Sequence, residues 1–146
     1  MSNSRRVLRH VTTIAMLLIV QGAFDLTFGL ALAGIAVGLV TGAVPIPMET
    51  APPESRAAVL AFAPALLLVG GLKVYAGIRN YRYRGRLLGI VALASCVVSL
   101  ANCLCTPLAL PLLVGGLIVY RHAEAERAFQ MGEQGLSREW IRASRR

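Results

Sequence analysis

Long apolar stretches restrict this chain more than any other feature. Val11–Val44 contains no lysine or arginine, and both Ala57–Leu72 and Leu87–Tyr120 are uncharged. About 20 consecutive apolar residues are enough for a helix to cross the hydrocarbon core of a bilayer. Only 15% of the residues are charged and 56% are hydrophobic, whereas soluble domains have roughly 25% and 45–50%. The sequence therefore predicts an all-α integral membrane protein.

Breaks in the apolar pattern divide the chain into four predicted spans. Four prolines mark an exposed loop at 41–56, and Pro107 divides the last apolar stretch into two short helices. The predicted segments are a cytoplasmic N-terminus at 1–10, spans at 11–40, 57–78, 87–104 and 105–120, a periplasmic loop at 41–56, a basic cytoplasmic turn at 79–86 and a basic cytoplasmic tail at 121–146. The expected architecture is a membrane four-helix bundle.

The arginines predict how this bundle is oriented. Thirteen arginines fall in the N-terminus, the basic turn and the tail, whereas the 41–56 loop holds only Arg56. Cytoplasmic segments of membrane proteins are enriched in lysine and arginine, and interfacial aromatic residues flank the spans. Four spans with both termini in the cytoplasm satisfy this rule, and three spans do not. All four tyrosines fall at the predicted cytoplasmic ends, as interfacial residues do: Tyr75, Tyr81, Tyr83 and Tyr120.

The net charge of +8 has a membrane explanation rather than a nucleic-acid one. The basic residues flank apolar spans and do not form the face of a soluble fold, so we expect no nucleic-acid partner. In the tail, the fourth helix is expected to continue to about Met131, before Gly132 and Gly135 interrupt it. Residues 137–145 then form either a short basic helix on the anionic inner leaflet, with Trp140 and Ile141 inserted, or a solvated tail.

A repeated segment raises the question of internal duplication. Leu67–Tyr75 and Leu112–Tyr120 match at eight of nine positions, and the mismatch is Lys73 against Ile118. Duplication would give two repeated helical hairpins related by an axis along the membrane normal. Chance similarity between apolar helices is the alternative. In either case, Lys73 departs from a purely structural pattern.

Three polar residues within the predicted spans are candidates for function. Gln21 and Asp25 are one turn apart and share a helix face with Gly29, with Gly22 close by, so this stripe is suited to face the bundle. Lys73 lies about 9 Å from the cytoplasmic end of its span at 1.5 Å per residue. Charges inside a span are expensive and are functional candidates by default. The alternatives are an ion or proton site, a structural ion pair, or a lysine that reaches the headgroups alone.

Glycines predict where helices pack closely. Gly34, Gly38 and Gly42 are spaced by four, which favours helix contact within the bundle or between protomers. The repeated segments carry the paired glycines Gly70, Gly71, Gly115 and Gly116, which are expected to let another backbone approach.

The cysteines offer a weaker candidate site. Cys103 and Cys105 fall at the predicted outer turn, and Cys96 lies two turns earlier on the same face as Cys103. Such residues could pair or bind a soft metal in an oxidising compartment. Membrane thiol oxidoreductases with four helices use Cys-x-x-Cys and a second pair, which this chain lacks. Small residues at a tight turn are the simpler interpretation.

The stretch Gly77–Tyr120 resembles a group of small bacterial proteins with four transmembrane helices and no known activity. The matching motifs are Gly77-Ile78-Arg79-Asn80, Arg84-Gly85-Arg86, Leu88-Gly89-Ile90-Val91-Ala92-Leu93, Cys103-x-Cys105-x-Pro107 and Gly116-Leu117-Ile118-Val119-Tyr120. The resemblance implies a multi-pass protein of the bacterial inner membrane, and it carries no functional residues.

These patterns favour a non-enzymatic membrane protein that acts as a scaffold or interaction partner. The sequence shows no nucleotide-binding loop, metalloprotease motif or nucleophile beside a base, so we predict no catalytic residue, metal or other cofactor. The expected partners are the lipid bilayer with its anionic inner leaflet, and a second copy or other membrane proteins. The competing hypotheses are a small ion or proton transporter using Asp25 and Lys73, and a thiol or metal site at Cys103 and Cys105.

Overall fold

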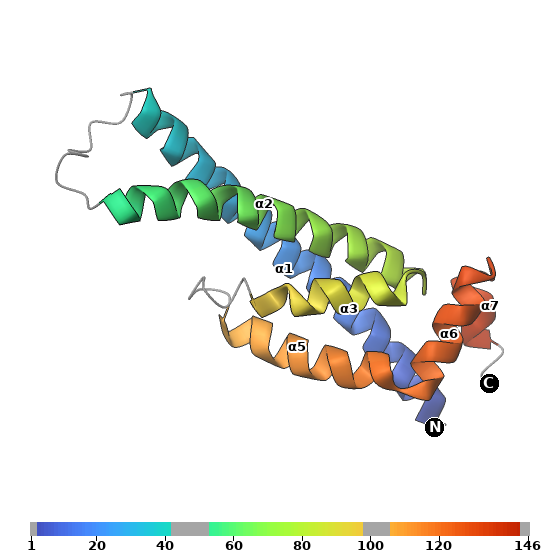
Figure 1. Cartoon of the computed structure of the whole chain (residues 1–146). Coiled ribbons are helices and arrows are strands. Elements are labelled where there is room, and N and C mark those ends of the chain that lie inside the picture. Colours follow the sequence, from blue (N-terminus) through green and yellow to red (C-terminus); the bar gives the residue numbers. More distant parts are fainter. Residues whose placement is uncertain (1–2, 42–52, 98–105, 144–146) are drawn as a thin grey trace.

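The prediction of an all-α fold is confirmed. The computed structural model describes residues 3–41, 53–97 and 106–143, and all regular secondary structure in these ranges is helical. The helices are α1 (Asn3–Val40), α2 (Pro53–Tyr81), α3 (Arg86–Ala94), α5 (Thr106–Arg121), α6 (Ala123–Glu133) and α7 (Arg138–Ala143) (Figure 1).

Helices α1 and α2 form a long antiparallel hairpin that dominates the fold (Figure 1). With 38 and 29 residues, they are about 57 and 44 Å long at 1.5 Å per residue. Their segments Arg6–Gly38 and Leu60–Tyr81 are long and apolar enough to cross a membrane. The apolar part of α5, Ala109–Arg121, is shorter. Pro64 lies inside α2 on an exposed face, and the helix continues through it.

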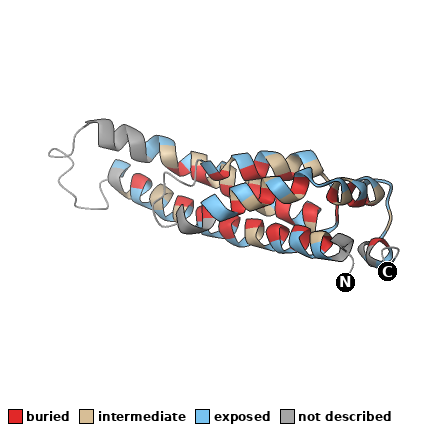
Figure 2. Ribbon diagram, turned by 90° about the horizontal axis from the view of Figure 1, so that it is seen from below, coloured by how far each residue is buried: buried red, intermediate tan, exposed pale blue. Residues whose placement is uncertain are grey.

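Helices α3 and α5 cover only one half of this hairpin. They lie beside the half where α1 begins and α2 ends, and the other half of α1 and α2 extends beyond them (Figures 1 and 2). Large apolar side chains are exposed along the extension, including Leu30, Val37 and Leu60. We call the opposite end, which holds the start of α1 together with α6 and α7, the terminal end of the bundle.

A seven-residue repeat of small residues lets α1 and α2 approach closely. The buried members are Ala15, Gly22, Gly29 and Ala36 on α1, and Ala63, Gly70 and Gly77 on α2. Residues seven apart lie on nearly the same face of a helix. A Cβ added to Gly22 would lie 2.7 Å from the carbonyl oxygen of Gly70, and one added to Gly70 would lie 2.8 Å from that of Gly22. Backbone therefore packs on backbone at this crossing.

The two similar segments do not occupy equivalent places. Gly70 packs against α1, whereas its counterpart Gly115 has open space around it. At the next position, Gly71 has open space and its counterpart Gly116 packs against Leu93. Tyr75 is 53% exposed, whereas its counterpart Tyr120 is 0% exposed. The contacting faces thus differ by one residue, or about 100° of helix rotation. The two segments therefore lie in different environments, and internal duplication stays a prediction.

The prediction that the fourth helix continues into the tail is wrong. His122 adopts an extended conformation and caps α6, with its Nδ1 accepting a hydrogen bond from the Glu124 amide at 3.3 Å. Helix α6 therefore starts in a new direction and contacts α1 and α5 (Figure 1). In α7, Ile141 is completely buried in the core, which contradicts its insertion into lipid, while Trp140 is 53% exposed.

Three aromatic rings hold α6 against the terminal end. Phe129 packs edge-on against Tyr83 and Tyr120, with ring centroids 6.2 and 5.4 Å apart. The Tyr83 hydroxyl donates to the carbonyl oxygen of Leu8 at 3.3 Å, which ties this cluster to α1. Tyr83 and Tyr120 are thus covered by protein, and their placement at a membrane interface stays a prediction. Gly132 lies directly against the Tyr83 carbonyl and leaves no space for a side chain there.

Gly70→Ala is expected to destabilise the bundle by about 1–3 kcal/mol, because the new methyl group meets backbone of α1. Gly71→Ala is the matched control, since its Cβ meets nothing within 4 Å, and it should be neutral or stabilising by up to about 1 kcal/mol. Thermal unfolding in detergent measures both variants. Equal stability of the two would contradict the α1–α2 contact described here.

Phe129→Ala is expected to release α6 from the terminal end, because loss of a buried phenylalanine costs about 3–5 kcal/mol. Limited trypsin digestion checks this by the rate of cleavage after Arg127, whose side chain is 64% exposed. Gln130→Ala, on the adjacent exposed position, should leave the cleavage rate unchanged. The same rate for both variants would show that the aromatic cluster does not hold α6.

Candidate functional site: a buried polar cluster between three helices

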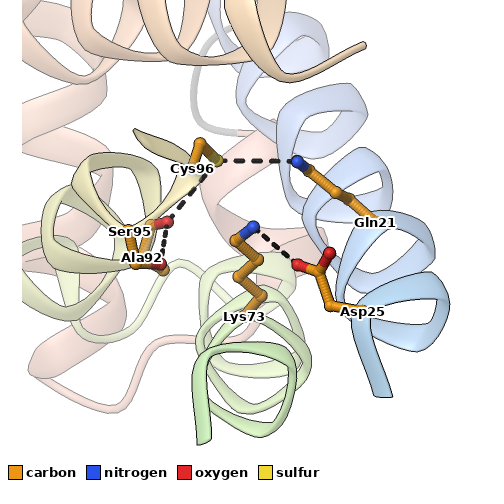
Figure 3. Close-up of polar contacts among 6 residues, drawn as sticks. All are labelled: Gln21, Asp25, Lys73, Ala92, Ser95 and Cys96. Carbon is orange, nitrogen blue, oxygen red and sulfur yellow. Dashed lines mark hydrogen bonds and ion pairs between the residues drawn. The ribbon is translucent and has the colours of Figure 1, made fainter. Parts of the chain in front are cut away.

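The central feature of the site is an ion pair between α1 and α2. The Lys73 Nζ lies 2.7 Å from the Asp25 Oδ2, and both side chains are 0% exposed (Figure 3). The sequence leaves the pairing of these two residues open, and the structure brings them into contact. A charge-assisted hydrogen bond of this length, shielded from solvent, is among the stronger polar interactions in proteins.

The small-residue contact explains why the two charges meet. Asp25 follows Gly22 by three residues, and Lys73 follows Gly70 by three, so both charges lie within one turn of the crossing. A Cβ on Gly22 would lie 2.9 Å from the Cβ of Lys73. The absent side chain at Gly22 therefore leaves room for the first part of the lysine chain, and the ammonium extends to the carboxylate.

A third segment adds a thiol to the cluster. The Sγ of Cys96, just beyond α3, lies 3.5 Å from the Gln21 Oε1 and 3.6 Å from the Ala92 carbonyl oxygen, and its single hydrogen is donated to one of them or shared between both (Figure 3). Both Gln21 and Cys96 are 0% exposed. Within the described ranges, the Gln21 Nε2 has no hydrogen-bond partner. The polar stripe predicted on the first helix thus faces the bundle, with Gln21, Gly22, Asp25 and Gly29 all buried.

One of the three cysteines, Cys96, lies in the part of the chain that the structure describes. Cys96 is a free, buried thiol that belongs to the Asp25–Lys73 cluster. Cys103 and Cys105 lie outside the described residues, so the thiol or metal site predicted for them stays a prediction. No group of three or more potential metal ligands occurs among residues 3–41, 53–97 and 106–143.

The predicted packing glycines divide into two groups. Gly70 contacts α1, and an added Cβ on Gly116 would lie 2.6 Å from a methyl group of Leu93. In contrast, Gly34, Gly71 and Gly115 make no close contact within the described part of the chain. Gly38 is half-buried. A role for Gly34 and Gly38 between protomers stays a prediction.

Sequence reasoning missed the buried polar residues at the terminal end. Asn80 and Tyr120 are completely buried, and both lie next to Gly89, whose missing side chain makes room for them. Arg86 donates from its Nε to the carbonyl oxygen of Tyr120 at 3.0 Å and pairs with Glu126. Asn80 stands at the boundary of a predicted span, where polar residues are common, so its sequence position gives no signal of burial.

Comparison with models of known protein families, with curated proteins and with solved structures finds no match for this chain. The resemblance to small bacterial four-span proteins therefore stays a prediction, and the function must be argued from the site.

Breaking one side of the ion pair should be costly. Asp25→Asn leaves a buried ammonium without its carboxylate and is expected to destabilise by about 3–5 kcal/mol, whereas Asp25→Asn combined with Lys73→Met should recover most of that loss. Thermal unfolding in detergent of Asp25→Asn, Lys73→Met and the double variant gives the coupling energy between the two side chains. Thr27→Val, on the exposed side of α1, is the control for loss of a polar group. Additive effects of Asp25→Asn and Lys73→Met would contradict a coupled pair.

Proposed function

We propose that this chain is a non-enzymatic integral membrane protein that serves as a structural and assembly element, with four spans and both termini in the cytoplasm. The observation that carries the proposal is the contrast between inside and outside. The only charges deep within α1 and α2 neutralise each other at 0% exposure, while large apolar side chains such as Phe24, Leu30 and Leu68 are 62–76% exposed. A soluble fold does not leave so much apolar surface uncovered, whereas lipid favours it.

The distribution of charge supports the count of four spans. Helices α1 and α2 satisfy the length requirement directly. Helix α5, with 16 residues, reaches only about 24 Å, and a local thinning of the bilayer accommodates a span of this length. The start of α1, the α2–α3 turn and α6 lie at one end (Figure 1), which agrees with the positive-inside rule for four spans.

The geometry of the ion pair favours a structural role over transport. Polar groups that carry ions through a membrane line a water-filled cavity or form a relay. The Lys73 Nζ instead lies 2.7 Å from the Asp25 Oδ2, and neither side chain has exposed surface. The pair lies next to the crossing where the backbones of α1 and α2 are in contact.

Reconstituted in liposomes, wild-type protein and Asp25→Asn should therefore show the same background proton and cation flux. Flux in the wild type that Asp25→Asn abolishes would favour the transporter hypothesis.

The extended half of the hairpin supports assembly as the role. Gly34 lies on the side of α1 roughly opposite the residues that contact α2, and an added Cβ there meets nothing within 4 Å. Exposed small residues in a span allow another helix to approach closely, and lipid offers no competing hydrophobic effect. Self-association through this face is consistent with the spacing of Gly34 and Gly38.

Gly34→Leu is expected to reduce self-association in a bilayer about tenfold or more, because the larger side chain separates the facing helices. Förster transfer between labelled copies in liposomes, measured across protein-to-lipid ratios, tests this. Gly71→Leu is the control, since Gly71 also has open space but lies on α2 beside the covered half. Monomeric wild-type protein at all ratios, or an equal effect of both variants, would rule out assembly through Gly34.

A further inference from the structure

An open groove lies between α2, α3 and α6 at the terminal end. Its volume is about 810 Å³, which is within the usual range for sites that bind small molecules. Leu72 from α2 and Leu88 and Val91 from α3 form its apolar wall. Arg79, Arg86, Glu126 and Glu133 also line it, so the groove combines an apolar surface with four charged groups.

The two kinds of surface are separated along the axis of the bundle. Leu72 and Arg79 are seven residues apart on α2, which corresponds to about 10 Å. Val91 is likewise about 7–8 Å along α3 from Arg86. Both glutamates belong to α6, which lies across the terminal end (Figure 1). The groove is therefore apolar toward the spans and charged toward the predicted cytoplasmic surface, as the polarity of a phospholipid is.

The charges in the groove are balanced, which restricts the headgroup. Arg86 and Glu126 form an ion pair with each other. Among the described residues, Arg79 and Glu133 have no ion pair, and the Arg79 Nη1 lies 3.4 Å from the Tyr75 hydroxyl. One cation and one anion thus remain to receive a ligand. A purely anionic headgroup would find favourable contact at Arg79 but repulsion from the carboxylate of Glu133.

We propose that this groove binds a phospholipid with a zwitterionic headgroup that carries a primary ammonium, of the phosphatidylethanolamine class. The phosphate pairs with Arg79, the ammonium donates hydrogen bonds to Glu133, and the acyl chains lie along Leu72, Leu88 and Val91. A primary ammonium has three N–H donors, whereas the trimethylated group of phosphatidylcholine has none and satisfies Glu133 less well. This inference rests on the proposed membrane location.

Native mass spectrometry of the full chain in detergent tests the site. The protein is incubated with equal amounts of phosphatidylethanolamine, phosphatidylglycerol and phosphatidylcholine. We expect one phosphatidylethanolamine to be retained preferentially, and Arg79→Gln or Glu133→Gln to reduce its retention roughly tenfold, as loss of one hydrogen bond to a charged group does. Arg82→Gln and Glu139→Gln remove exposed charges outside the groove and should have no effect.

A steric variant tests the position of the acyl chains separately. Val91→Trp fills the apolar wall and should reduce retention by a similar factor, whereas Ile118→Trp, at a position 66% exposed on α5, should not. Preferential retention of phosphatidylglycerol, equal retention of the three lipids, or indifference to the groove variants would overturn the proposal. Carbonate extraction of cell membranes separates failure of the membrane location from failure of the lipid site. Release of the protein into the soluble fraction contradicts the membrane location. Retention in the membrane without a lipid preference in mass spectrometry contradicts only the lipid site in the groove.

Discussion

The contact of two backbones at Gly22 and Gly70 is the constraint on which the rest of the structure depends. It brings α1 and α2 so close that Asp25 and Lys73 meet within one turn of it. In the apolar interior, neither charge is tolerable without an oppositely charged partner, so the ion pair in turn permits only one register of the two helices. The segment after α3 adds Cys96 to the surface that this hairpin creates. A larger side chain at either glycine would disturb packing and electrostatics together.

The sequence indicated which polar residues would lie in the centre of the bundle, and only some of the glycines that hold it together. Asp25 and Lys73 are recognisable because each interrupts a long apolar run, but the sequence does not decide whether the two form a pair. Gly70 is one of the predicted packing glycines and contacts α1, whereas the spacing of four at Gly34 and Gly38 does not find the rest of the contact. The structure instead uses a spacing of seven, in which alanines stand at some positions, so a search for glycine alone does not find it.

The terminal end was less predictable because its contacts join segments far apart in sequence. The break at His122 has no glycine or proline before it, and its extended conformation is stabilised by a local cap. Tyr83 and Tyr120 have the sequence positions of interfacial anchors, and only the return of α6 places Phe129 between them. Amphipathicity predicts that a helix has an apolar face, but it does not say whether lipid or protein covers that face.

On the membrane location proposed above, the positions of the two charged residues along the chain have a consequence for insertion. A lone aspartate or lysine costs about 2.5–3.5 kcal/mol at the centre of a span. Asp25 precedes Lys73 by 48 residues, and the two charges lie on consecutive helices, so each can meet its partner as soon as the α1–α2 hairpin forms. Inserted together, the two helices are an electrically neutral pair at this point of the bundle. A permuted chain in which other helices separate α1 from α2 would leave one charge in lipid until its partner is made.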